Sequence, residues 1–347
     1  MLKSRRRQEK TIVGLEMDPS HLAAAQVAVN GKVSVTKGAV VDLRPGVVRD
    51  GEVADPVALT EALRELFAGG ELPTQVRLGI ANQRIVVRTL DVAPVDDPKV
   101  LEELVRSEAP DHIPVPMDEA VLDFVSLGQV ETVAGPRTRV VIVAVRREMV
   151  ERMVASAQEA GLEVVGIDLS AFGMVRALRE AGNAGAVLYI NLAGLTNVAV
   201  ANDTGCLFTR AATGGLDAMV QTLTERRGLT VEHARGWMRH VGLETPLDEI
   251  EGDPALVAAV RQALDDGVHT IADTVRNSLN FYRMQENADV VDRAVLTGPA
   301  VEIPGFAAAL SAQLQMPVAP TVVAGSPGDA DLGRLTVAAG LAVDTTP

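Results

Sequence analysis

The sequence predicts an α/β protein made of two similar halves, and three observations support this fold class. Short apolar strands alternate with helical segments along most of the 347 residues. A unit of one apolar strand, a turn and two further strands occurs at residues 11–41 and again at residues 186–211. The length suggests two domains, at roughly 150 residues per domain. The cleft between two such halves, where turns and helix N-termini converge, is the default ligand site.

Strands are expected where short apolar runs are bounded by turn residues. Asn30-Gly31 predicts a tight hairpin between two of them. The expected strands are residues 11–15, 22–29, 32–41, 76–80, 84–90, 120–127, 138–145, 164–169, 187–192, 198–201, 206–211, 294–296 and 318–320.

Helices are expected where apolar residues recur at helical spacing behind a start signal. Three such starts are Asp55-Pro56, Asp97-Pro98 and Asp253-Pro254, in which the aspartate is the N-cap and the proline takes the first helical position. Besides the helix that begins at Pro98, the expected helices are residues 55–67, 147–160, 170–180, 216–226, 305–314 and 335–343, and residues 228–290 are mostly helical.

Composition and charge exclude several classes of protein. Hydrophobic residues make up 47% of the chain, which is enough for a large core and excludes a disordered chain. The net charge of −14 argues against a nucleic-acid partner, since such proteins usually display a basic face. Residues 1–10 form a basic arm of charge +4, and no apolar segment follows it, so it is not a signal peptide. The single cysteine, Cys206, fits a reducing compartment.

Short motifs in a fixed order carry a resemblance to a known family. They are Gly14–Ser20, Ile113–Pro116, Val121–Phe124, Ala144–Glu148, Ser278–Gln285 and Ala338–Leu341. Each motif is weak alone, but their order and spacing together resemble the PilM family of type IV pilus assembly, within the actin-like ATPase superfamily. The related FtsA proteins normally end in an amphipathic membrane helix, and residues 332–347 offer none.

The resemblance implies an actin-like fold, that is, a duplicated ribonuclease H-like fold of two lobes, with an inserted subdomain of the FtsA type. The first lobe would comprise residues 11–86, 166–185 and 331–347. The inserted small subdomain would comprise residues 87–165. The second lobe would comprise residues 186–330, with a helical cap at residues 226–290.

The resemblance also implies a nucleotide cleft, whose residues depart from the family pattern. The positions that match it are Gly14, Glu16, Ser20, Asn191, Gly194, Thr196, Asn197, Gly214, Gly215 and Gly298. In the first turn, Asp18 stands where the family has glycine, and a carboxylate beside a phosphate costs on the order of 4 kcal/mol at about 4 Å. Pro19 removes a backbone donor.

Three further positions depart from the pattern. Asn191 replaces the family aspartate near Mg²⁺, Pro299 follows Gly298 in the adenosine loop, and Arg235 replaces a glutamate that would contact adenosine.

From these departures we expect no catalytic residue and no metal site. We predict no cofactor firmly, and ATP and Mg²⁺ are left open but doubtful. The alternatives are an active actin-like ATPase, a sugar or acetate kinase and an FtsA-like filament.

The resemblance further implies an adaptor in the cytoplasm, at the inner face of the bacterial cytoplasmic membrane. It would bind the N-terminal cytoplasmic peptide of the membrane protein PilN in a groove between the first lobe and the inserted subdomain, and would reach pilus platform and motor components indirectly. The basic arm suits contact with anionic lipid, or is a disordered tail, and a homodimer stays open. The expected groove walls are Val87, Leu90, Val92, Glu108, Ile113, Pro114 and Pro116.

Overall fold

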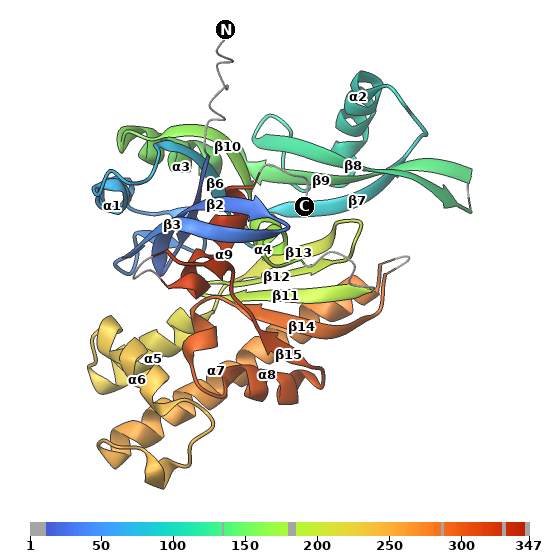
Figure 1. The fold of residues 1–347 in the computed structure, drawn as a ribbon. Coiled ribbons are helices and arrows are strands. Elements are labelled where there is room, and N and C mark those ends of the chain that lie inside the picture. Colours follow the sequence, from blue (N-terminus) through green and yellow to red (C-terminus); the bar gives the residue numbers. More distant parts are fainter. Residues whose placement is uncertain (1–11, 134, 180–184, 286–287, 328–330, 344–347) are drawn as a thin grey trace, which may run out of the picture.

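Two lobes, each built on its own sheet, make up most of the molecule (Figure 1). The computed structural model describes residues 12–133, 135–179, 185–285, 288–327 and 331–343. Both sheets repeat one arrangement, in which an antiparallel meander of three strands is extended from its first strand by two parallel strands. This repetition confirms the predicted duplication.

The strands of the two sheets follow the sequence-based expectation closely. In spatial order, the first sheet contains β10 (Glu163–Leu169), β6 (Gln75–Ile80), β1 (Val13–Asp18), β2 (His21–Asn30), β3 (Lys32–Asp42) and β16 (Ala324–Gly325). The second contains β13 (Cys206–Ala212), β12 (Thr196–Ala201), β11 (Ala186–Leu192), β14 (Val291–Thr297) and β15 (Val318–Pro320). A short ribbon of β4 (Val48–Arg49) and β5 (Glu52–Val53) follows β3. The predicted hairpin is confirmed, because Asn30 pairs with Lys32 across Gly31, whose φ is +77°.

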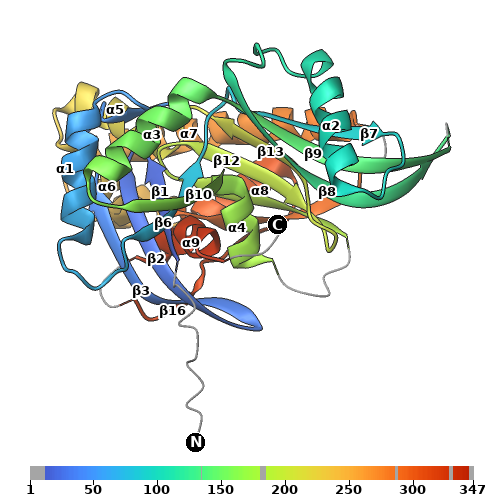
Figure 2. The same ribbon diagram turned by 90° about the horizontal axis from the view of Figure 1, so that it is seen from above.

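Helices cover both faces of the first sheet (Figure 2). On one face lie α1 (Pro56–Phe67) and α3 (Arg147–Glu159), and on the other lie α4 (Ser170–Leu178) and α9 (Leu332–Leu341). All residues of β1 are therefore buried. In the second lobe, α5 (Leu216–Arg227), α6 (Val231–Val241), α7 (Pro254–Arg283) and α8 (Phe306–Leu314) share a separate core with the second sheet.

A third sheet forms the inserted subdomain. Its strands, in the order β7 (Val86–Val92), β9 (Gly135–Arg146) and β8 (Ala120–Thr132), pack one face against α2 (Pro98–Glu108). We expected this subdomain to continue to residue 165. The sheet ends at Arg146, however, and the segments that follow belong to the first lobe, since β10 pairs with β6 and Met153 of α3 lies in the first core.

The Asp-Pro pairs begin helices as predicted. Asp55 accepts a hydrogen bond from the backbone N of Ala58 (3.0 Å), and Asp97 and Asp253 cap α2 and α7 in the same way. The last helix begins earlier than expected, at Leu332 instead of residue 335. Its N-cap is Asp331, whose carboxylate accepts from the N of Gly333 at 2.7 Å.

None of the described helices is both long and apolar enough to cross a bilayer. Within the long uncharged stretch at residues 181–202, the described part forms β11 and β12, as expected. The basic arm predicted at residues 1–10 lies outside the described residues.

The contact between α9 and α4 requires a glycine. A Cβ on Gly340 would lie 1.7 Å from the carbonyl oxygen of Gly173, whereas a Cβ on Gly236 of α6 would meet nothing within 4 Å. We expect Gly340→Ala to lower the free energy of unfolding by about 1–3 kcal/mol through overpacking.

The matched helix substitution Gly236→Ala should raise it by about 0.4–1 kcal/mol, because alanine loses less entropy in a helix. Thermal unfolding followed by circular dichroism measures both. Equal melting temperatures for the two variants would contradict this account of the α9–α4 contact.

Candidate functional site

The carboxylate of Asp18 links a turn of the first lobe to a turn of the second. Asp18 ends β1, and its Oδ1 accepts hydrogen bonds from the backbone N of Ser20 (2.8 Å), from Ser20 Oγ (2.6 Å) and from the backbone N of Gly194 (2.8 Å). Its Oδ2 accepts from the N of Leu195 at 3.4 Å. Asp18 is only 5% exposed, so these bonds form away from water.

The donors on Asp18 are the kind of group that binds anions. Backbone amides that converge from two turns bind phosphate in nucleotide-binding proteins. Here the chain's own carboxylate accepts hydrogen bonds from the amides of both turns. A Cβ on Gly194 would lie 2.6 Å from Asp18 Oδ1, so this contact also explains the glycine in the second turn. From the sequence alone we expected Asp18 to repel phosphate, and its role as an internal acceptor was missed.

Acidic side chains gather around Asp18. Burial, and secondarily the nearby charge of Asp18, raises the pKa of Glu16 well above its usual value. The same two causes raise the pKa of Asp217 at the start of α5. Burial also raises the pKa of Asp18 itself, although its hydrogen bonds act in the opposite direction. Burial therefore disfavours charge on these carboxyl groups, and the centre of the cleft is poorly suited to further negative charge.

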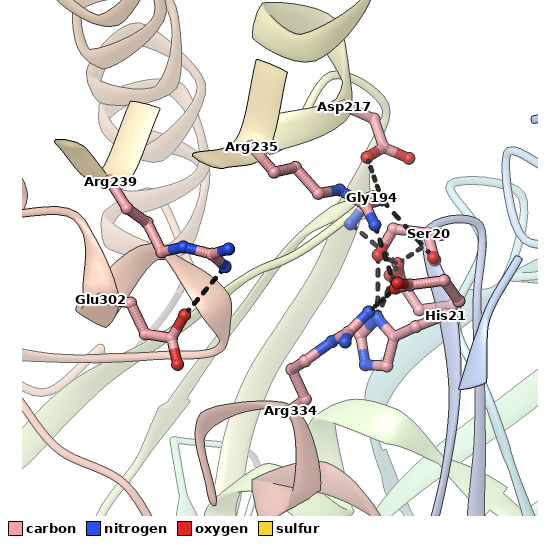
Figure 3. Close-up of polar contacts among 10 residues, drawn as sticks. Ser20, His21, Gly194, Asp217, Arg235, Arg239, Glu302 and Arg334 are labelled. Atoms are coloured by element: carbon pink, nitrogen blue, oxygen red, sulfur yellow. Dashed lines mark hydrogen bonds and ion pairs between the residues drawn. The ribbon is translucent and has the colours of Figure 1, made fainter. Parts of the chain in front are cut away.

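Two arginines from opposite lobes meet on Asp42, at the end of β3. Arg235 of α6 reaches Asp42 Oδ1 at 3.0 Å, and it also contacts the carbonyl oxygen of Ser20 and the carboxylate of Asp217. Arg334 of α9 pairs with the same Asp42 oxygen. Burial alone would raise the pKa of Asp42, but the arginines outweigh it and hold that pKa below its usual value. Arg235 thus adds a second link across the cleft (Figure 3).

The structure brings most of the predicted cleft residues together. Thr196 Oγ1 donates to the carbonyl oxygen of Gly214 at 3.1 Å, and the N of Gly215 donates to that of Gly194 at 3.3 Å. The remaining positions adjoin this group: Glu16 and Ser20 beside Asp18, Asn197 paired with Asn191, and Gly298 against Asn191.

Gly14 has a different place. A Cβ there would lie 1.9 Å from the carbonyl oxygen of Ala338, so Gly14 contacts α9 and not the phosphate turn.

The described residues do not point to metal binding or to a reactive thiol. Across the described ranges, no three His, Cys, Asp or Glu side chains gather as a metal site would require. His233 contacts Thr230 and His240 contacts the carbonyl oxygen of Glu251. Burial raises the pKa of the Cys206 thiol to about 12, so this thiol is not reactive.

An apolar groove lies between the first lobe and the inserted subdomain. Its cavity of about 670 Å³ is lined by β10, α3 and α4 on one side and by β8 and β9 on the other. Among its apolar lining residues are Val121, Phe124, Val143, Val150, Val165, Ile167 and Phe172. Val165 and Ile167 are 43% and 38% exposed, which is unusual for side chains of this kind within a sheet.

The groove also meets a strand edge. Every residue of β10 from Val164 to Leu169 lines it, and since side chains alternate between faces, the groove must face the edge of the strand. Within the described chain, β10 pairs only with β6, so its second edge is unpaired. Asp168 and Arg176 form an ion pair at this groove.

None of the seven residues predicted for the groove wall lines this groove. Leu90, Val92 and Ile113 are buried under α2, while Val87 and Pro114 line a second groove. Glu108 is half-buried and Pro116 is exposed.

The sequence does carry a signal for the wall of this apolar groove. Residues 140–145 of β9 are all apolar, so both faces of that strand need a cover, and α2 can cover only one.

Loss of the Asp18 carboxylate should destabilise the protein. Asp18→Ala leaves the amides of Ser20 and Gly194 buried without an acceptor, which costs about 1–3 kcal/mol per unpaired group. The melting temperature should fall by several degrees relative to wild type, whereas Asp203→Ala, in an exposed turn, should leave it unchanged. An Asp18→Ala protein as stable as wild type would show that the bridge contributes nothing.

The family assignment rests on the sequence and on the fold together. Residues 21–326 match the family model described as type IV pilus assembly protein PilM. Among solved structures, the PilM–PilN type IV pilus biogenesis complex contains a similar chain, with a TM-score of 0.77 and 24% identity over 96% of this chain and 97% of that one.

More distant structures share the fold. The ethanolamine utilization protein EutJ from Carboxydothermus hydrogenoformans has a TM-score of 0.54 at 17% identity, over 95% of this chain and 88% of that one. MreB 5 of Spiroplasma citri, bound to AMPPNP, has a TM-score of 0.54 at 12% identity, over 95% and 94%. With its duplicated sheets and inserted third sheet, the chain has the actin-like fold and belongs to the PilM family of type IV pilus assembly proteins.

Proposed function

We propose that this chain is an adaptor of the type IV pilus inner-membrane platform, which binds the N-terminal cytoplasmic peptide of a PilN-like membrane protein. The apolar groove beside β10 is the observation that carries the proposal. It is supported by the similar chain that is found in a complex with PilN. The adaptor would act in the cytoplasm at the inner face of the membrane, and it would reach other platform and motor components through its partner.

The groove suits an extended peptide. Such a peptide can add a strand to the unpaired edge of β10, and main-chain hydrogen bonds then supply affinity while side-chain pockets supply specificity. Alternate side chains would point toward the apolar surface of Val143, Val150 and Phe172. The Asp168–Arg176 pair offers a polar contact beside that surface.

A single charge in the groove should weaken this binding. Ile167→Asp places a carboxylate on the apolar wall, and loss of one buried apolar side chain, at about 1.5–3 kcal/mol, predicts at least tenfold weaker binding. Fluorescence anisotropy with a labelled N-terminal peptide of the PilN-like protein encoded beside this gene measures the effect.

Val133→Asp is the matched control, because Val133 is fully exposed at the tip of the β8–β9 hairpin and should bind like wild type. Failure of the wild-type protein to bind the peptide at tens of micromolar would overturn the adaptor proposal.

The proposed adaptor has a degenerate nucleotide cleft without a catalytic residue. ATP would have to displace Asp18 from the amides of Gly194 and Leu195, and Arg235 already lies across the cleft. The alternative is an ATPase that cycles between open and closed clefts. MreB 5 binds AMPPNP, but at 12% identity it shares only the fold with this chain.

Calorimetric titration with Mg-ATP separates the two possibilities. We expect no binding by the wild-type protein at tens of micromolar. Asp18→Gly should bind measurably better, since it frees the amides of Ser20, Gly194 and Leu195 and removes a charge worth on the order of 4 kcal/mol of repulsion at about 4 Å. Micromolar affinity of the wild-type protein would favour the ATPase.

A further inference from the structure

A second groove lies between the inserted subdomain and the second lobe. Two adjoining cavities, of about 540 and 370 Å³, share Val87 and Arg88 of β7 with Phe208, Thr209 and Phe281 of the second lobe. Strands β7 and β13, which line these cavities, are labelled in Figure 1. It is separate from the apolar groove, which lies beside β10 and shares no lining residue with it.

Two unpaired strand edges face the second groove. Consecutive residues of β7, Val86 to Thr89, and of β13, Leu207 to Ala211, line the two cavities. Because neighbouring side chains in a strand point to opposite faces, a lining of consecutive residues places the strand edge in the groove. Of the described strands, only β9 pairs with β7 and only β12 pairs with β13. Both strands thus offer unpaired backbone donors and acceptors there.

The groove is positively charged in a strongly acidic protein. Arg84, Arg88, Arg146 and Arg210 line the larger cavity, and no aspartate or glutamate does. Arg84 pairs with Glu52, but Arg88, Arg146 and Arg210 form no ion pair with the described residues. In the smaller cavity, Asp91 is already held by Arg139 through bonds of 2.7 and 2.8 Å. The whole chain has a net charge of −14, so this positive charge is local.

An aromatic side chain completes the surface. Phe281, in the last turn of α7, is 48% exposed although its ring contacts that of Phe208 at 6.0 Å. It lines both cavities and offers an apolar contact between the charged positions.

We infer that this groove binds an extended acidic segment of a protein partner. The segment adds a strand to the edge of β7 or β13, its carboxylates bind Arg88, Arg146 and Arg210, and one apolar side chain packs on Phe281. A peptide fits better than a lipid head group or a nucleic acid, because only a peptide backbone pairs with an unpaired strand edge while the same chain supplies anionic side chains. The inference does not depend on PilN binding at the apolar groove.

The test uses the full chain and a fluorescein-labelled decapeptide of alternating valine and glutamate. Controls are the same peptide with lysine in place of glutamate, and a version with proline in place of valine, which removes half of the backbone donors. We expect the anisotropy to report binding of the glutamate peptide alone. This binding should weaken as salt is added. Hydrogen exchange should show protection within residues 86–92 or 206–212.

Charge-reversal variants distinguish an effect of the groove arginines on peptide binding from an effect of the protein's net charge. The triple variant Arg88→Glu, Arg146→Glu and Arg210→Glu should bind the glutamate peptide at least about tenfold more weakly. Its matched control reverses three exposed basic residues elsewhere, Arg44, Lys99 and Arg226, and should retain wild-type binding. Circular dichroism verifies that both variants are folded.

Several outcomes would overturn the inference. They are no binding of the glutamate peptide at millimolar concentration, equal binding of the lysine or proline peptide, protection outside the two strands, or equal loss in both triple variants. Tighter binding of a labelled uridine decanucleotide, or of vesicles rich in phosphatidylglycerol, would assign the groove to another class of partner.

Discussion

One buried carboxylate links the turns of the two lobes, in addition to the apolar core that α4 shares with the second sheet. Asp18 accepts hydrogen bonds from turns in both lobes, and separating the lobes would break its bonds to the amides of Gly194 and Leu195. In other proteins, backbone amides that converge at such turns bind phosphate groups. Here the chain supplies the anion itself. Arg235 and Arg334 reinforce the contact from the two sides through Asp42.

The surfaces of the inserted sheet form part of the two grooves that we propose as binding sites. The inserted sheet stands between two lobes, and α2 covers only one of its faces. Its other surfaces contribute to two grooves of contrasting chemistry. The groove toward the first lobe is apolar and meets the edge of β10, whereas the groove toward the second lobe is lined by arginines and meets the edges of β7 and β13. Both follow from a small sheet whose edge strands are not covered by neighbours.

Sequence patterns predicted the elements well where the cause was local. The Asp-Pro helix starts and the Asn30-Gly31 hairpin depend on interactions within a few residues, and the repeated strand unit revealed the duplication. The subdomain boundary was less well predicted, because strand β10 joins the first sheet through pairing with β6, some 90 residues earlier in the chain.

The sequence by itself determined the family, the duplicated fold and the presence of Asp18 in the first turn, because each can be recognised from short motifs and from the periodicity of apolar residues. Only the tertiary structure decided what Asp18 contacts and where the apolar groove lies. Asp18 meets Gly194 from 176 positions away, and the apolar groove brings β10 against β8 and β9. Such contacts depend on how the whole lobes pack. In this packing, the carboxylate of Asp18 accepts the hydrogen bonds of the turn amides.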